Sequence, residues 1–220
     1  MKRLRLAATG GIAAVTLALA GCGSSAPSAA PPAPTGGAAA PTTSAAGTAN
    51  TQRVTTISDI MGPACSKVPA EGPGSAKGMV DDPVATAAGN NPLLTTLTKA
   101  VKAAGLVDTL NDPSASYTVF APANAAFEAL PPGTLDQLLA DKAKLTQILT
   151  YHVVPKRYDA AGLAEAGTVT TVEGSKLTIT GEPGSLVIDQ QEQASVLCGN
   201  IPTANATVFV IDKVLMPEPA

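Results

Sequence analysis

The chain has 220 residues, of which 45% are hydrophobic, so it has room for one ordinary folded domain with additional segments. Three of its 14 Lys and Arg residues, Lys2, Arg3 and Arg5, lie at the extreme N-terminus, and the other 11 stand against 17 acidic residues. An acidic domain without a run of basic residues repels phosphate backbones, which excludes nucleic acid as an expected partner.

Residues 1–21 have the pattern of a lipoprotein signal peptide. The N-terminal basic residues precede an apolar stretch from Leu6 to Ala20, shorter than the roughly 20 residues that a membrane span needs. The sequence Leu19-Ala20-Gly21-Cys22 resembles the bacterial lipobox, whose cysteine becomes the first mature residue and carries a diacylglyceryl group. The resemblance implies lipid attachment at Cys22 on the outer face of the cell membrane, since two acyl chains give stable anchoring. The alternative is an ordinary signal and a secreted protein.

Residues 22–54 are predicted to form a tether. From Gly23 to Thr51, every residue except Asn50 is Ala, Pro, Ser, Thr or Gly. Such a segment cannot bury enough apolar surface to offset its ordering entropy, so we expect it to be disordered. The folded domain is therefore expected over residues 55–220.

Two helices are predicted in the first half of this domain, each starting at a residue followed by proline. Asp82 and Asn91 are expected to act as N-caps with proline at the first helical position. We expect the first helix to end at Gly89 and the second at Gly105, because glycine favours the left-handed conformation that closes a helix.

Two further helices are predicted between residues 134 and 152. Thr134 and Gln137 have the spacing of a capping box, and a second helix is expected from Asp141. The apolar face of that second helix is expected to hold Leu145, Ile148, Leu149 and His152.

Strands dominate the rest of the domain. Runs of β-branched and aromatic residues predict strands at 117–121, 168–172, 176–180, 186–188 and 207–215. The second and third flank Glu173-Gly174-Ser175, a hairpin pattern, and Pro122 is expected to stop the first. Helices come mostly before strands along the chain, which indicates the α+β class.

Cysteine usage points to one intramolecular bond. With Cys22 assigned to the anchor, Cys65 and Cys198 remain. Outside the cytoplasm such a pair usually forms a disulfide, and two free buried thiols are the alternative. A metal site is disfavoured because the chain has one His and no CxxC motif.

Three segments resemble the signatures of fasciclin (FAS1) domains. YTVFAPANAAF at 117–127 resembles the first signature, ILTYHVVP at 148–155 the second, and NATVFVIDKVLMP at 205–217 the closing strand. The resemblance extends from about residue 62 to residue 217. The sequence of this region, including the cysteines at positions 65 and 198, is similar to an actinobacterial branch of secreted or lipid-anchored surface antigens. It implies a single α+β domain, a β-wedge or sandwich of about seven strands with surrounding helices.

The resemblance also implies local roles. Asn124 is expected to cap the short helix after the first signature, and Phe127 to pack beneath the strand. Tyr151 and His152 either belong to an adhesive surface or form an internal pair that holds the helix end. We expect the internal role, with the contact surface on neighbouring exposed loops such as 156–159. Asn205-Ala206-Thr207 matches the N-glycosylation pattern but is interpreted as a turn into the last strand.

The expected function is adhesion or binding at the cell surface, without catalysis. The resemblance implies an extracellular-matrix, host-cell or envelope partner. We also expect a monomer, membrane contact through the lipid anchor, and no cofactor. An enzyme is disfavoured because no GxSxG motif occurs. The alternative is a carrier of a small molecule or lipid, which should contain a connected apolar cavity, whereas an adhesin should present an exposed patch.

Overall fold

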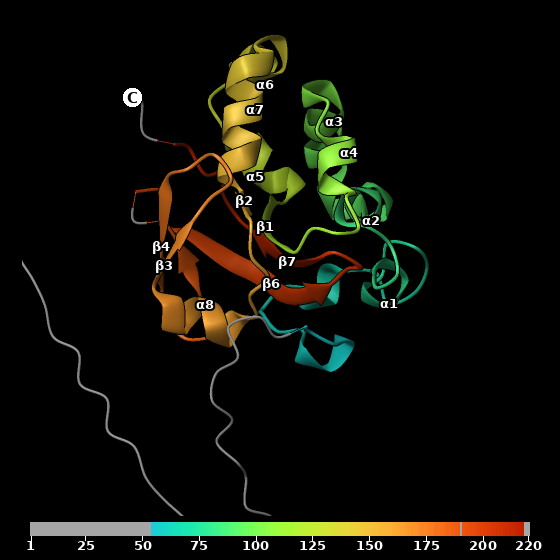
Figure 1. Ribbon diagram of the computed structural model, residues 1–220. Helices are drawn as coiled ribbons and strands as arrows, with labels where there is room; N and C mark the ends of the chain where they lie inside the picture. Colours follow the sequence, from blue (N-terminus) through green and yellow to red (C-terminus); the bar gives the residue numbers. More distant parts are fainter. Residues whose placement is uncertain (1–53, 190, 218–220) are drawn as a thin grey trace, which may run out of the picture. The chain divides into compact units, whose positions relative to one another are not determined.

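The computed structural model describes residues 54–189 and 191–217, which lie in one compact unit, Ala46–Ala220. The predicted signal peptide, Cys22 and almost all of the predicted tether lie outside the described residues. The helices of the described part are η1 (Ile57–Asp59), η2 (Cys65–Lys67), α1 (Ala76–Met79), α2 (Val84–Asn90), η3 (Pro92–Leu94), α3 (Thr95–Ala104), α4 (Val107–Leu110), α5 (Asn124–Glu128), α6 (Thr134–Ala140), α7 (Lys142–Tyr151) and α8 (Ala160–Ala166) (Figure 1).

The strands form one mixed sheet in the order β2-β1-β7-β6-β5-β4-β3. They are β1 (Tyr117–Pro122), β2 (Val153–Val154), β3 (Thr168–Thr170), β4 (Lys176–Thr180), β5 (Val187–Ile188), β6 (Ala194–Pro202) and β7 (Ala206–Ile211). β1 and β7 pair in parallel, and the other neighbours are antiparallel. The expected class and the expected number of strands are confirmed.

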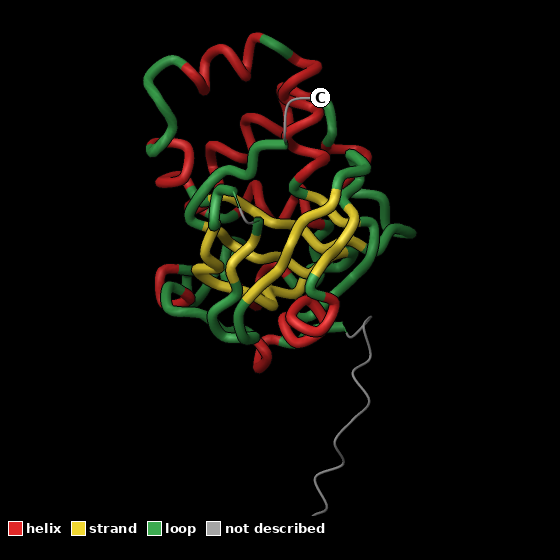
Figure 2. Tube along the Cα trace, turned by 90° about the vertical axis from the view of Figure 1, so that its left-hand side faces the viewer, coloured by secondary structure: helices red, strands yellow, loops and turns green. Residues whose placement is uncertain are grey.

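The sheet curls so that its two edges meet. The Val172 N–H, just after β3, donates to the Val153 carbonyl of β2 over 2.7 Å. Figure 2 shows the strands crossing one another in two layers, with most helices gathered on one side. The contact covers part of each edge, which leaves fewer backbone groups open to another chain.

The alternation of side chains along β1 and β7 creates two cores. Val119 and Val208 point to the side covered by α1 to α7. Phe120 and Phe209 point to the other side, where α8 and strands β3 to β6 enclose them. Their ring centroids lie 5.9 Å apart and both rings are fully buried. Phe127 is buried in the first core, as the resemblance implied.

The predicted cap of α2 is wrong. Pro83 precedes the first helical residue, and the Asp82 carboxylate accepts a bond from Asn90 instead. The first N–H groups of α2 instead donate to side chains that are distant in the sequence. The Asn205 side chain accepts the Val84 N–H over 2.9 Å, and Asn111 accepts the next two N–H groups over 3.1 and 3.3 Å. The helix ends at Asn90, one residue beyond Gly89.

Asn124 also has a role different from the expected one. It is the first residue of α5, and its side-chain oxygen accepts the Thr96 N–H of α3 over 3.0 Å. Its amide donates to the Pro92 carbonyl over 2.9 Å. Asn124 therefore links α5 to the start of α3. The Asn91 cap and the Gly105 C-cap, with φ of 73°, are confirmed.

The helices between residues 134 and 151 form as predicted, but the capping box does not. Gly133 is the N-cap of α6, and Thr134 is already helical. Asp141 caps α7 by accepting the N–H groups of Ala143 and Lys144, each over 3.1 Å. The predicted apolar face of α7 is buried.

Several strand predictions need correction. β7 ends at Ile211, four residues earlier than expected, and β3 ends at Thr170, two residues earlier. β1 includes Pro122, which was expected to stop it, and neither β2 nor β6 was predicted. β6 contains Gly199 and Asn200, residue types that usually mark turns. Shifts in the β6–β7 register accommodate them, and Asn200 adopts a φ of 60°. A side chain at Gly199 would lie 2.7 Å from the Phe209 ring, so only glycine fits there without movement.

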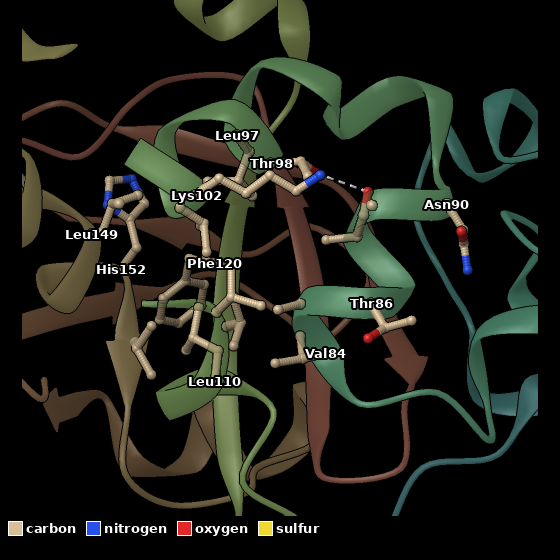
Figure 3. Close-up of a pocket in the computed structure, with 17 residues that line it drawn as sticks. Val84, Thr86, Asn90, Leu97, Thr98, Lys102, Leu110, Phe120, Leu149 and His152 are labelled. Atoms are coloured by element: carbon tan, nitrogen blue, oxygen red, sulfur yellow. Dashed lines mark hydrogen bonds between the residues drawn. The ribbon is translucent and has the colours of Figure 1, made fainter. Parts of the chain in front are cut away.

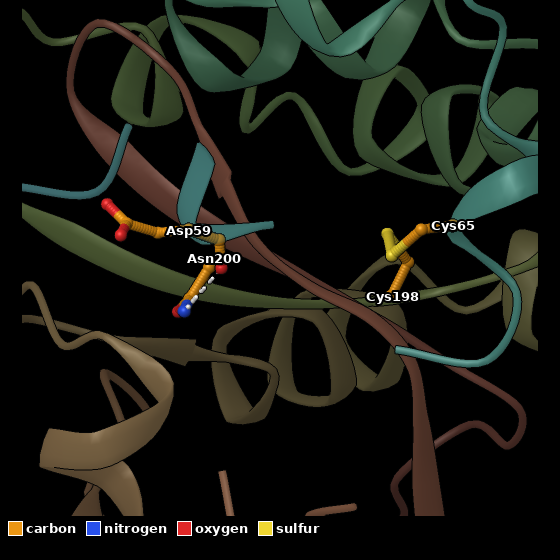
Figure 4. The surroundings of a disulfide bond; sticks show 4 residues. All are labelled: Asp59, Cys65, Cys198 and Asn200. Atoms are coloured by element: carbon orange, nitrogen blue, oxygen red, sulfur yellow. Dashed lines mark hydrogen bonds between the residues drawn. A yellow bond between two sulfur atoms is a disulfide. The ribbon is translucent and has the colours of Figure 1, made fainter. Parts of the chain in front are cut away.

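Residues 59–65, which we call the strap, lie along β6 and are bonded to it. Cys65 and Cys198, the two cysteines expected to pair, are joined by a disulfide (Figure 4). Met61 and Gly199 form a backbone bridge, and the Asn200 amide donates to the Asp59 carbonyl over 3.0 Å. The strap therefore joins residues that are 133 positions apart in the sequence.

Candidate functional site

The Tyr151–His152 pair lies where α7 ends and β2 begins. His152 is 2% exposed, and both its ring nitrogens are engaged. Nδ1 lies 2.8 Å from the Ile148 carbonyl, one turn back in α7, while Nε2 accepts the Leu215 N–H over 3.0 Å. Since Nε2 accepts, Nδ1 carries the proton. The ring therefore joins the end of α7 to the segment that follows β7.

Burial determines the charge of this ring. Desolvation lowers the pKa of His152 from 6.5 to about 4, and the hydrogen bond to Ile148 opposes the shift only in part. His152 is therefore neutral at pH 7. A neutral ring with both nitrogens occupied has no free position for general-base catalysis or for contact with a partner.

Tyr151 points into the second core and is 5% exposed. Its hydroxyl donates to the Asp189 carboxylate over 3.4 Å, near the end of β5. The backbone carbonyl of His152 accepts the Phe120 N–H of β1 over 2.9 Å. Tyr151 thus connects the end of α7 to the residue after β5, and the His152 backbone connects it to β1.

The expectation of an exposed loop at 156–159 is wrong for half of its residues. Arg157 and Asp159 are each 8% exposed. The Arg157 guanidinium donates to Thr207 Oγ1, over 3.2 Å, and to the carbonyls of Thr203 and Ala204. Desolvation lowers the pKa of Arg157. Lys156 and Tyr158 are half-buried, and the Lys156 ammonium lies 4.7 Å from the Tyr158 ring centroid.

A mostly apolar pocket of about 310 Å³ lies between α2, α3, α4, α7 and β1 (Figure 3). Its apolar lining includes Val84, Leu97, Val101, Leu110, Val119 and Leu149. His152 also contributes to the wall. In Figure 3, Lys102 lies with Leu97 and Thr98 on α3, on the opposite side of the view from Val84 and Leu110.

Small residues on α2 account for this space. Ala85, Ala88 and Gly89 all line the pocket, at positions that share one face of the helix. Their short side chains cannot reach across to α3, so a gap remains where Leu or Ile would fill the core. A Cβ atom placed at Gly89 would meet only Thr98, at 3.7 Å. The carrier alternative predicts a connected apolar cavity, and these three small residues at helical spacing are the one feature of the sequence that could have located it.

The chain is similar in sequence to a known family of domains and to several named proteins. The chain matches the fasciclin domain over residues 92–217. It is 44% identical to the cell surface glycolipoprotein MPB83 of Mycobacterium bovis, over 96% of this chain and 95% of that protein. It is also 44% identical to the immunogenic protein MPT70 of Mycobacterium tuberculosis, over 94% of this chain and 96% of that protein.

More distant proteins share the same fold. Protein sll1483 of Synechocystis is 42% identical over 61% of this chain and 72% of its own length. The FAS1 domain pair of the insect cell adhesion molecule fasciclin I superposes with a TM-score of 0.56 at 20% identity. That match covers 64% of this chain and 53% of the insect chain. Within the described residues, no helix is both long and apolar enough to cross a bilayer.

Proposed function

Because the chain belongs to the fasciclin domain family, we propose that it is a binding module of the cell surface that mediates adhesion without catalytic turnover. The observation that supports this most is its similarity, along nearly its whole length, to proteins named cell surface glycolipoproteins. The names of these relatives describe surface location and immunogenicity, and neither property is a chemical reaction. The partner is an envelope or extracellular component.

We further propose attachment through a diacylglyceryl group on Cys22, with residues 22–54 as the tether that holds the domain away from the membrane. The lipobox-like sequence and the uncharged composition of the following segment support this arrangement. The word glycolipoprotein in the names of the mycobacterial relatives is consistent with it.

The adhesive contact lies outside the Tyr151–His152 pair, because both side chains are buried and bonded internally. Lys156 and Tyr158 are the better candidates in this region. They are partly exposed and form a cation–π pair, and tyrosine is enriched in protein interfaces.

The test measures binding and melting temperature on the same protein samples. Four proteins are incubated with cell-envelope fragments and with matrix polymers: wild type, His152→Ala, Tyr158→Ser and a control. The control is Leu139→Ser, on the exposed side of α6. We expect Tyr158→Ser to melt normally and bind weakly, and His152→Ala to lose binding only in proportion to lost folded protein. A stable His152→Ala protein that no longer binds would overturn the internal role.

A second candidate function is supported by the pocket of about 310 Å³. This volume is at the lower end of the range of small-molecule sites, about 300–1,000 Å³. A surface carrier of an apolar compound is therefore the alternative to adhesion.

A further inference from the structure

We infer that the pocket between α2 and α3 binds a single-chain amphiphile with a negatively charged head group, such as a medium-chain carboxylic acid. The inference rests on the second candidate function and specifies its ligand. It is independent of the proposed adhesive contact, because neither Lys156 nor Tyr158 lines the pocket.

The size and lining of the pocket determine the apolar part of the ligand. An engineered cavity of about 150 Å³ lined by apolar residues binds benzene. A pocket of about 310 Å³ therefore accommodates roughly twice that ligand, about a dozen carbon atoms. Most of the lining is aliphatic, which favours an alkyl chain.

Lys102 determines the charge of the head group. It is the one charged residue among those that line the pocket, and it is exposed. Among the described residues its ammonium group has no hydrogen-bond or ion-pair partner. An ammonium group at the rim of an apolar pocket attracts a carboxylate while the chain enters the apolar interior.

The polar groups deeper in the pocket are already satisfied. The His152 nitrogens bond to Ile148 and Leu215, and the Thr98 hydroxyl donates to backbone carbonyls of Ala88 and Leu94 over 3.1 and 3.0 Å. A ligand that carried polar groups along its chain would therefore leave them without partners, which costs free energy. One polar end and one apolar chain match the site.

The test measures binding of dodecanoate to the purified protein by titration calorimetry, well below its micelle concentration. Dodecanol is the uncharged comparison. Gly89→Leu is the blocking variant, because a Cβ atom there makes only an ordinary contact with Thr98 and leucine is a better helix former than glycine. Lys102→Gln removes the charge, and Lys99→Gln is the matched control on an exposed residue of α3 that does not line the pocket. Melting temperatures confirm that each variant is folded.

We expect one dodecanoate per protein, no measurable binding to Gly89→Leu, and about threefold weaker binding to Lys102→Gln at low salt, as for an exposed ion pair. Lys99→Gln should bind as wild type does. Absence of saturable binding to wild type, or equal binding to wild type and Gly89→Leu, would overturn the site. Equal binding to wild type and Lys102→Gln, or tighter binding of dodecanol than of dodecanoate, would overturn the anionic head group. Envelope pull-down uses a separate readout, so failure here leaves adhesion to be judged on its own.

Discussion

Acidification should destabilise the protein through a single histidine. In the folded state, His152 has a pKa of about 4, against 6.5 for an unperturbed ring. The unfolded chain therefore binds a proton more readily than the folded one between these pH values. Stability is fully present above pH 6.5 and is lost as the pH falls toward 4. Below about 4 the folded ring also takes the proton, so the loss levels off.

The magnitude follows from the shift. The pKa difference of about 2.5 corresponds to a total of about 3.5 kcal/mol, at about 1.4 kcal/mol per pKa unit. Between pH 7 and pH 5 the expected loss in the free energy of unfolding is about 2 kcal/mol. This window is informative because most carboxylates stay ionised throughout it.

The structural cause is specific. Protonation places a hydrogen on Nε2, which then can no longer accept the Leu215 N–H, and a charged ring remains in a buried site. His152→Asn preserves a donor near the Nδ1 position but cannot titrate. Since this is the only histidine of the chain, the variant should show a flat profile between pH 7 and pH 5 at a lower overall stability.

The assay is urea unfolding followed by circular dichroism at pH 7, 6 and 5, on both proteins. We expect the wild-type free energy of unfolding to fall by about 2 kcal/mol across the window and that of His152→Asn to change by less than about 0.5 kcal/mol. A wild-type slope equal to that of the variant would refute the assignment of the ring as a buried neutral acceptor.

Three further predictions concern other parts of the chain. Cys22→Ser should release the protein into the medium or leave it unprocessed, and mass spectrometry of the mature N-terminus should detect the lipid only in wild type. Replacing Cys65 and Cys198 by Ala should lower the free energy of unfolding by up to ~5 kcal/mol, and non-reducing peptide mapping of wild type should recover one linked pair. Asn205→Ala should cost about 3 kcal/mol in urea unfolding, because its buried side chain bonds Val84, Leu110 and Asp112, whereas exposed Asn90→Ala should cost under about 0.5 kcal/mol.

Local signals predicted most elements, but not the partners of the capping side chains. Asn91 and Gly105 act on their own helices, so residue type and neighbours were sufficient. Asn205 acts on a helix 121 positions away, and Asn124 on one 28 positions away. Nothing in a local window distinguishes an asparagine that caps its own helix from one that caps another. Asn124 was misassigned for this reason, and the cap predicted at Asp82 failed because Asn205 and Asn111 accept the first N–H groups of α2 instead.

β6 escaped prediction for a related reason. Its Gly199 and Asn200 have turn-like propensities, but tertiary contacts override them. Gly199 is required by the closeness of Phe209, and the Asn200 side chain bonds to both Asp59 and Ala160. The pocket was not predicted from the sequence because small residues at helical spacing are also typical of an ordinary helix. Whether they leave a cavity depends on the side chains of the elements packed opposite them.

The polar side chains of the family motifs form hydrogen bonds within the domain. His152 holds the segment after β7, Asn205 joins α2 to α4, and Asn124 joins α5 to α3. Because each bond connects segments distant in sequence, losing any of them would disturb the assembly of the domain, whatever the domain binds. Such motifs therefore identify the fold but carry little information about the ligand. Ligand specificity must come from residues free of these structural bonds, and for the pocket we propose Lys102 and the small side chains of α2.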